Sequence, residues 1–404
     1  MNPSAPPVGR APVRHDPAPS PALPAAPLHL KYLDGLRALA ALYVLVHHSF
    51  LQVYPGHRPV AGRFTAWGDL FFYGGYAVAL FIVLSGFCLA LPVVRGDGRL
   101  KHGVLGFLRG RALRILPPYF LAVAASLLLI WGCIGRETGT HWDVSIPVSG
   151  KSIVTHLLLI HDLVGDFASI NHSFWSIAVE WRIYLLFPLL VVAWRAAGPL
   201  GSTALVLVAS YLAFRGLLPF DHRAYHVHFA GLFTLGMLAA TVAYSPAPFY
   251  ARLRKAPWAL LALAGLAGVV VASKVPLPNG ELLQGYQRDY VVGIWATALL
   301  VYLATRPQSA LHRLLSRQPL VWLGGFAYSI YLMHAPLIQV VWQYLLFPLH
   351  SDDTVTFRVL VLVGTPVIVA NCYLFYVCCE KPFVRLKNKS ALPGKAGAVR
   401  CLKA

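Results

Sequence analysis

The side chains with the clearest chemical potential are Arg37 and His48, which lie eleven residues apart in an apolar segment. Eleven residues make almost three whole helical turns, so both side chains project from one face of a helix, about 16 Å apart along its axis. A histidine near neutral pH can accept a proton from a hydroxyl group or carry an acyl group itself. An arginine suits an anionic group on a bound donor. This spacing favours His48 over its neighbour His47 as the reacting group, with Arg37 holding a donor.

Arg37 and Glu180 each have a structural explanation beside the functional one. An arginine near a helix end can extend toward lipid phosphate. Glu180 is a carboxylate well inside another apolar segment, where it needs a partner or stays protonated. Arg182 is two residues away and points elsewhere on the helix, so it is not the expected partner. Glu180 therefore either forms a buried pair that fixes helix packing, or it assists a site by orienting a histidine or binding substrate hydroxyls.

Membrane-spanning helices must position these side chains. Of the 404 residues, 57% are hydrophobic and only 12% are charged, and a soluble domain carries about twice that share of charge. The apolar residues come in blocks of about twenty, as helices that cross the hydrocarbon core require. We predict an all-α polytopic membrane protein with about ten transmembrane helices. The spans are expected near residues 31–53, 69–93, 112–134, 172–194, 201–218, 226–244, 256–273, 289–306, 322–346 and 357–380.

The formal net charge of +19 indicates topology rather than nucleic-acid binding. With these ten spans, about 23 of the 34 Lys and Arg residues fall in the two tails, in every second loop or at the span ends beside them, against about 8 at the other loops. The positive-inside rule then places both termini in the cytoplasm, and anionic lipid adds to the attraction. We predict a multi-pass protein of the inner (plasma) membrane, with the lipid bilayer as a partner and no nucleic acid.

The chain divides into one membrane domain and two tails. Residues 1–28 are rich in Pro and Ala and are predicted to be a disordered cytoplasmic tail. Residues 29–385 form the ten-helix membrane domain, and residues 386–404 form a basic cytoplasmic tail. The longest external connection, residues 135–171, is expected to be functional, and an amphipathic interfacial helix is expected near residues 154–161. The six cysteines lack the spacing of metal ligands, so no metal is expected.

Several short motifs, in this order and spacing, resemble the acyltransferase 3 family of membrane-embedded O-acyltransferases. They are Leu33-Asp-Gly-Leu-Arg37 through His48, Phe81-Ile-Val-Leu-Ser85-Gly86-Phe87, Arg109-Gly-Arg111-Ala-Leu-Arg114-Ile-Leu-Pro117-Pro118-Tyr119, Trp175-Ser176 with Glu180 and Tyr184, Ser329-Ile-Tyr331-Leu-Met-His334, and Glu380-Lys-Pro-Phe383. The resemblance covers about residues 30–385. One departure is Trp181, which follows Glu180 where many members of the family have a second acidic residue.

The resemblance implies an O-acyltransferase that takes an acyl group, with acetyl favoured, from acyl-CoA. It implies a hydroxyl acceptor on a carbohydrate-containing molecule, such as an exopolysaccharide or a lipid-linked or cell-surface glycan. The implied catalytic residues are His48, Glu180 and Arg37; Arg37 also binds the donor with Arg109, Arg111 and Arg114, and the substrate-binding residues are Trp175, Ser176, Tyr184 and His172. The three arginines of residues 109–114 could instead be topology charges, His172 a solvated loop residue, and His334 an interior hydrogen-bonding group.

Two rival functions stay open at this point. One is acylation of a small glycosylated natural product such as a macrolide, because the sequence does not identify the acceptor. The other is a proton-coupled transporter, because ionisable residues inside spans also form proton relays. The motif series and the absence of a recognisable internal repeat favour the enzyme.

Overall fold

The computed structural model describes residues 30–390, except 59–67, 97, 217–225 and 279–281. The described chain is helical throughout and contains no strand. Its α-helices are α1 (Lys31–Val53), α2 (Gly68–Phe72), α3 (Gly75–Arg95), α4 (Gly103–Leu129), α5 (Gly150–Leu157), α6 (Trp175–Phe214), α7 (His228–Tyr244), α8 (Pro248–Leu253), α9 (Trp258–Lys274), α10 (Gly285–Thr305), α11 (Ala310–Leu315), α12 (Gln318–Gly324), α13 (Ala327–Val341), α14 (Asp353–Val359), α15 (Thr365–Phe375) and α16 (Lys381–Ser390). The predicted N-terminal tail and residues 391–404 lie outside the described residues.

Within the described residues, six helical segments are long and apolar enough to cross a membrane. They are Lys31–Val53, Gly75–Arg95, Gly103–Ile134, Trp175–Ala213, Ala327–Leu349 and Asp353–Leu386. Two shorter apolar helices are α7 and α9. The chain is thus a multi-pass, all-α membrane protein, as predicted, while the count of ten spans and the cytoplasmic termini stay predictions.

Several predicted spans differ in detail from the structure. The segment expected at 69–93 is divided into α2 and α3 by the turn at Tyr73 and Gly74. The spans expected at 172–194 and 201–218 follow one another as α6, with a break at Gly198, whose φ of 72° is a left-handed conformation that favours glycine. Pro199 follows directly and supplies no backbone N–H to continue the first helix.

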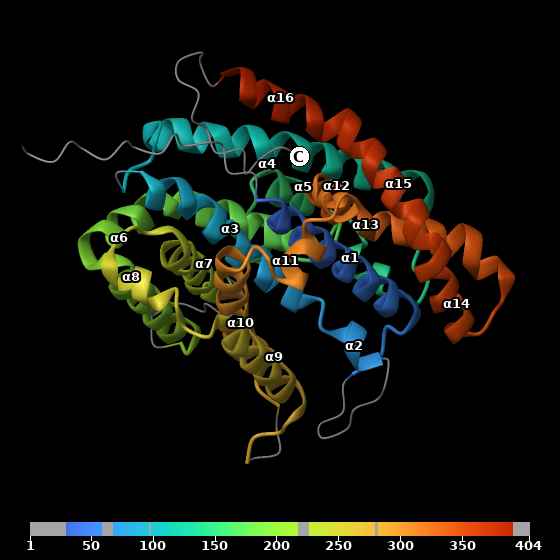
Figure 1. Ribbon diagram of the computed structural model, residues 1–404. Helices are drawn as coiled ribbons and strands as arrows, with labels where there is room; N and C mark the ends of the chain where they lie inside the picture. Colours follow the sequence, from blue (N-terminus) through green and yellow to red (C-terminus); the bar gives the residue numbers. More distant parts are fainter. Residues whose placement is uncertain (1–29, 59–67, 97, 217–225, 279–281, 391–404) are drawn as a thin grey trace, which may run out of the picture.

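Helix α1 lies in the middle of the bundle and packs against α3, α11, α12 and α13 (Figure 1). Helix α3 also packs very closely on α7, because a Cβ atom at Gly86 would lie 2.0 Å from the carbonyl oxygen of Phe233. Helices α4 and α16 lie side by side at one edge of the molecule, and α9 and α10 lie together at another. This arrangement surrounds both ends of α1 with side chains from distant parts of the sequence.

The long connection between α4 and α6 folds back onto the bundle. It contains the short 3-10 helices η2 (His141–Ser145) and η3 (His161–Val164), with α5 between them. Helix α5 begins at a capping box of Ser149 and Ser152, so it starts before the amphipathic segment predicted at 154–161 and ends before His161. A paired Arg182 and Asp162 fasten the loop to α6, and the Asn171 side chain donates to the Leu332 carbonyl of α13 at 3.0 Å.

Candidate functional site

A cavity of about 120 Å³ opens near the N-terminal end of α1, which we call its first end. It lies between α1, α3, α4, α6 and α13. It is lined by three of the predicted donor-binding residues, Arg37, Arg111 and Arg114, and by Glu180 and Tyr184. We call it the arginine cavity.

Arg109, the fourth predicted donor-binding residue, is exposed and does not line the cavity. The reason is helical phase: Arg111 and Arg114 are three residues apart and share a face of α4, whereas Arg109 is rotated about 200° from Arg111. Arg111 and Arg114 thus share the cavity, whereas a role of Arg109 in donor binding stays a prediction that the cavity does not support.

The cationic side chains of the cavity are held in place. Arg37 donates to Asp34 Oδ1 at 2.8 Å and to Cys88 Sγ at 3.0 Å. Arg111 is only 8% exposed, and its guanidinium lies over the Tyr184 ring at 6.0 Å. These contacts fix the direction of the guanidinium groups, so the cavity has a preformed positive end suited to an anion.

Glu180 finds hydroxyl partners rather than a basic one. It accepts a hydrogen bond from Ser85 Oγ at 2.6 Å and another from the Tyr184 hydroxyl. Arg182 pairs with Asp162 instead, in agreement with its expected direction. Burial alone does not mark Glu180, because Glu380 is more buried and accepts a hydrogen bond from Ser329. What distinguishes Glu180 is that it faces the arginine cavity.

Tyr331 connects this cavity to the second end of α1. It lines the cavity with Ser176, and the two hydroxyl groups are hydrogen-bonded at 2.6 Å. The Tyr331 ring also lies 5.7 Å from the ring of His334. Trp175, in contrast, stacks on His226 at 4.3 Å and contacts Phe229 of α7, so its ring does not line the cavity.

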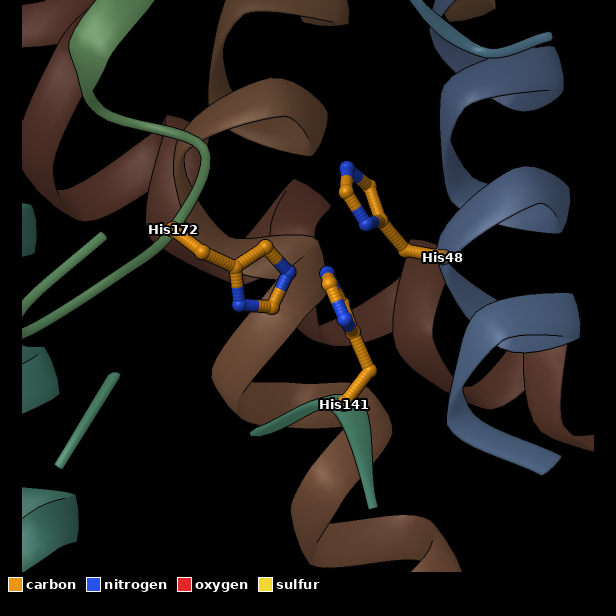
Figure 2. Close-up of side chains that lie close together, drawn as sticks. All are labelled: His48, His141 and His172. Atoms are coloured by element: carbon orange, nitrogen blue, oxygen red, sulfur yellow. The ribbon is translucent and has the colours of Figure 1, made fainter. Parts of the chain in front are cut away.

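Four histidines lie together near the C-terminal end of α1, which we call its second end. We call them the histidine cluster: His48, His141, His172 and His334. The His48 ring lies 4.6 Å from that of His172, 5.1 Å from that of His334 and 5.9 Å from that of His141. The rings of His141 and His172 are 4.6 Å apart. Figure 2 shows the first three facing one another, from α1, from η2 and from the loop before α6. Predicted residues His48 and His172 thus lie together.

Hydrogen bonds leave one nitrogen of several rings unused. His334 Nδ1 lies 2.8 Å from the Tyr331 carbonyl, which can only accept, so this nitrogen carries the proton. His172 Nδ1 lies 3.1 Å from Ser145 Oγ. Among the described residues, His48 Nδ1, His172 Nε2 and His334 Nε2 are buried and have no hydrogen-bond partner. A ring nitrogen without a hydrogen-bond partner can use its lone pair to accept a proton or to bind a ligand.

The two loop histidines of the cluster are kept neutral by their surroundings. Burial lowers the pKa of His172 well below its usual value, and the neighbouring His141 lowers it further. Burial also lowers the pKa of His141, with a smaller contribution from the charge of Arg58. A second pair, His156 and His161, stacks deeper in the same loop at 3.8 Å, and burial followed by the neighbouring His156 lowers the pKa of His161 to about 3.

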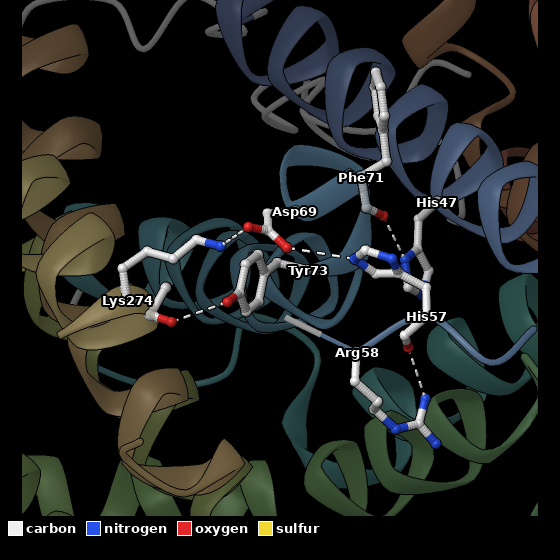
Figure 3. A network of polar contacts seen from close by, with 8 residues as sticks. His47, His57, Arg58, Asp69, Phe71, Tyr73 and Lys274 are labelled. Atoms are coloured by element: carbon white, nitrogen blue, oxygen red, sulfur yellow. Dashed lines mark hydrogen bonds and ion pairs between the residues drawn. The ribbon is translucent and has the colours of Figure 1, made fainter. Parts of the chain in front are cut away.

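His47 contacts the histidine cluster and also holds α2 in place. Its ring lies 4.8 Å from that of His48. Its Nδ1 donates to the Phe71 carbonyl at 2.8 Å, and Tyr43 donates to the Leu70 carbonyl at 2.6 Å (Figure 3). In the same region, Asp69 pairs with Lys274 and lies 3.3 Å from His57. The bond to Phe71 engages one ring nitrogen of His47, whereas His48 Nδ1 has no hydrogen-bond partner among the described residues.

Sequence reasoning did not identify His141, Ser85 or Tyr331 as site residues. Ser85 and Tyr331 lie in motifs that carried the family resemblance, so their position in those motifs was an available signal. His141 belongs to a loop without regular spacing, and only the folding of residues 135–171 brings it to His48. No local pattern pointed to it.

Comparison with known proteins gives one family and several relatives. The family model described as an acyltransferase domain matches residues 30–377. O-acetyltransferase OatA of Staphylococcus aureus is 25% identical over 341 residues, which make up 79% of this chain and 52% of that protein. YrhL of Bacillus subtilis, whose name describes a peptidoglycan O-acetyltransferase, is 25% identical over 325 residues, 76% of this chain and 48% of that protein.

A third relative matches a shorter region. Acyltransferase MdmB of Streptomyces mycarofaciens is 30% identical over 173 residues, 41% of this chain and 40% of that protein. The chain spans about half the length of the relatives OatA and YrhL. No solved structure matches it.

Proposed function

This chain belongs to the acyltransferase 3 family, and from that premise we propose that it is a membrane O-acyltransferase that uses acyl-CoA as donor. The acyl group is acetyl in the first instance, and the acceptor is a hydroxyl group of a carbohydrate-containing molecule. The observation that carries the proposal is the continuity of the two ends of α1. The arginine cavity reaches Tyr331, Tyr331 contacts His334, and His334 contacts His48.

The arginine cavity is the proposed donor site. Arg37, Arg111 and Arg114 provide charge-assisted hydrogen bonds for the phosphates of CoA, which lie at the cytoplasmic end in the proposed topology. In this proposal the pantetheine arm enters the cavity, whose lining is partly apolar, and the phosphates lie at the three arginines. Ser176 and Tyr184 line the path of this arm, and Glu180 holds the hydroxyl groups of Ser85 and Tyr184 in place.

His48 is the proposed reacting group. It accepts the proton of the acceptor hydroxyl while the oxygen attacks the thioester carbonyl. The C–O bond forms, the C–S bond breaks, and the CoA thiolate leaves and takes up the proton from His48. Transfer through a transient acyl-histidine reaches the same products in two steps. His172 faces His48 from the outer loop and is the proposed contact for the acceptor.

The relatives and the position of the cluster support a carbohydrate acceptor. YrhL carries peptidoglycan O-acetylation in its name. The histidine cluster lies at the end of α1 opposite the proposed cytoplasmic donor site, and His141 and His172 of the cluster come from the long loop that we predict to be external. A donor from the cytoplasm and an acceptor from outside would thus meet within one membrane domain of the inner (plasma) membrane.

The test is acyl transfer by the full-length protein purified into nanodiscs. Labelled acetyl-CoA is supplied with peptidoglycan fragments or other soluble glycans, and the labelled product is identified by mass spectrometry. We expect transfer by the wild type and not by His48→Ala. His350→Asn, at an exposed histidine, serves as the control and should transfer like the wild type. Proton-driven uptake that survives His48→Ala, without any acyl transfer, would show that the protein is a transporter.

A further inference from the structure

Three histidines of the cluster are close enough to share a metal ion. His48, His141 and His172 each offer a ring nitrogen, and these three nitrogens lie within 4.8 Å of one another. They come from α1, η2 and the loop before α6, and their rings face a common space (Figure 2). In a tetrahedral zinc site with bonds of about 2.1 Å, neighbouring nitrogens are about 3.4 Å apart. Side-chain rotations that move each nitrogen by about one ångström bring the three nitrogens to this separation.

The free ring nitrogens of the cluster suit a metal. A histidine that binds a metal must offer a ring nitrogen with a free lone pair. His48 Nδ1 and His172 Nε2 are buried without a hydrogen-bond partner among the described residues. A buried nitrogen without a hydrogen bond lowers the stability of the fold. A ligand shared by these two nitrogens would remove that cost.

The surroundings of His172 also resemble those of a metal ligand. Its Nδ1 is engaged by Ser145 Oγ at 3.1 Å, and the same Oγ accepts from the His172 backbone N–H at 3.2 Å. Metal-binding histidines are usually oriented in this way by a hydrogen bond at their other nitrogen. Ser145 is fully buried, so this orientation is not exchanged with solvent.

We propose that His48, His141 and His172 form a reversible binding site for a zinc-class divalent cation, and that occupancy of this site blocks acyl transfer. The first part stands on the geometry alone. The second rests on the proposed function, because a metal bound to His48 takes the lone pair that would accept the acceptor's proton. Three protein ligands leave a fourth coordination position for water or an anion, and an anion would offset the positive charge that Arg58 adds nearby.

The ligand set determines which ions bind. Three imidazoles without a carboxylate select Zn²⁺, Co²⁺ or Ni²⁺, whereas Mg²⁺ and Ca²⁺ require oxygen ligands. No local motif predicts this site, because metal motifs are recognised by short spacings and these three residues lie far apart in the chain.

The binding test uses the metal-free, full-length protein in nanodiscs. Co²⁺ is titrated while its visible absorption is recorded, and Zn²⁺ binding is measured by calorimetry. We expect one ion per chain, no response to Mg²⁺, and affinity at least tenfold weaker in His141→Ala and in His172→Gln. His350→Asn should bind like the wild type. Thermal unfolding without metal shows whether each variant is folded. His141→Ala is expected to disturb the core less than His172→Gln, because His141 is only partly buried.

The inhibition test is done on the same preparations. Each variant's transfer rate with Zn²⁺ is divided by its own rate without metal, so a change in basal rate does not enter the result. We expect inhibition of the wild type, reversal by a chelator, and at least tenfold more Zn²⁺ needed in His141→Ala. Absence of stoichiometric binding, or binding unaffected in both variants, overturns the metal site. Binding without inhibition overturns the blocking role, whereas failure of the metal-free wild type to transfer acetyl rejects the proposed function instead.

Discussion

The two ends of α1 hold two different kinds of buried polar site. At the first end, Arg37 and Arg111 keep their charge and are fixed by Asp34, Cys88 and the Tyr184 ring. At the second end, imidazole rings face one another, and three of their nitrogens have no hydrogen-bond partner among the described residues. A fixed, charged site can hold an anion without rearrangement, whereas unpaired nitrogens can gain and lose a proton or a ligand. In the proposed mechanism, this contrast separates donor binding from reaction along one helix.

The largest expected effect follows from removing the reacting group. His48→Ala should lower kcat about 10²- to 10⁴-fold, which is the usual contribution of a general base, and leave the KM for acetyl-CoA nearly unchanged. Steady-state kinetics in nanodiscs measures both. A rise in KM with an unchanged kcat would place His48 in donor binding and remove the contrast between the two ends.

The reverse pattern is expected at the other end. Arg111→Ala should raise the KM for acetyl-CoA about 10- to 100-fold, because a hydrogen bond to a charged group contributes about 1.5–3 kcal/mol. Arg109→Ala is the matched control: it removes the same charge two residues away on α4, but from an exposed side chain. Equal effects of the two substitutions would mean that net charge, rather than the cavity, attracts the donor.

Tyr331 lies between the two ends, and its hydroxyl is expected to matter less than either. Tyr331→Phe removes the hydrogen bond to Ser176 but keeps the ring against His334. We expect a loss of about fivefold in kcat/KM, equivalent to about 1 kcal/mol for a neutral hydrogen bond. Tyr373→Phe, at a tyrosine that does not line the cavity, should be neutral. A loss like that of His48→Ala would make Tyr331 part of the reacting group.

The smallest effect concerns the stability of the loop that carries His141 and His172. The pKa of His161 in the folded protein is about 3, below that of the unfolded chain. The unfolded state therefore binds a proton first as the pH falls, and stability is lost progressively from about pH 6.5 down to about pH 3. Lowering the pH from 6.5 to 5.5 should cost about 1 kcal/mol through this residue.

His161→Phe isolates this contribution, because it keeps a flat ring against His156 but cannot titrate. Thermal unfolding in detergent over this pH range should show a shallower loss of stability in the variant than in the wild type. Identical slopes would show that His161 is as accessible to protons in the folded loop as in the unfolded chain.

The sequence predicted the parts of the site that depend on local geometry. Arg37 and His48 were assigned to one helix from their spacing, and α1 contains both. Helical phase could also have separated Arg109 from Arg111 and Arg114 before the structure was known. The division of residues 69–93 into α2 and α3 was missed, because hydropathy averages over a turn as short as Tyr73 and Gly74.

Only the tertiary structure decided which side chains meet. Ser85 of α3 donates a hydrogen bond to Glu180 of α6. His141 and His172 meet His48 because of the path of their loop. The Arg182–Asp162 pair holds this loop in place, and so does the hydrogen bond from the Trp142 indole to the Ile134 carbonyl. The physical reason is one of range. Hydrophobic length and helical period act over a few turns and can be recognised in the sequence, whereas these meetings depend on the packing of segments about a hundred residues apart, which no local pattern encodes.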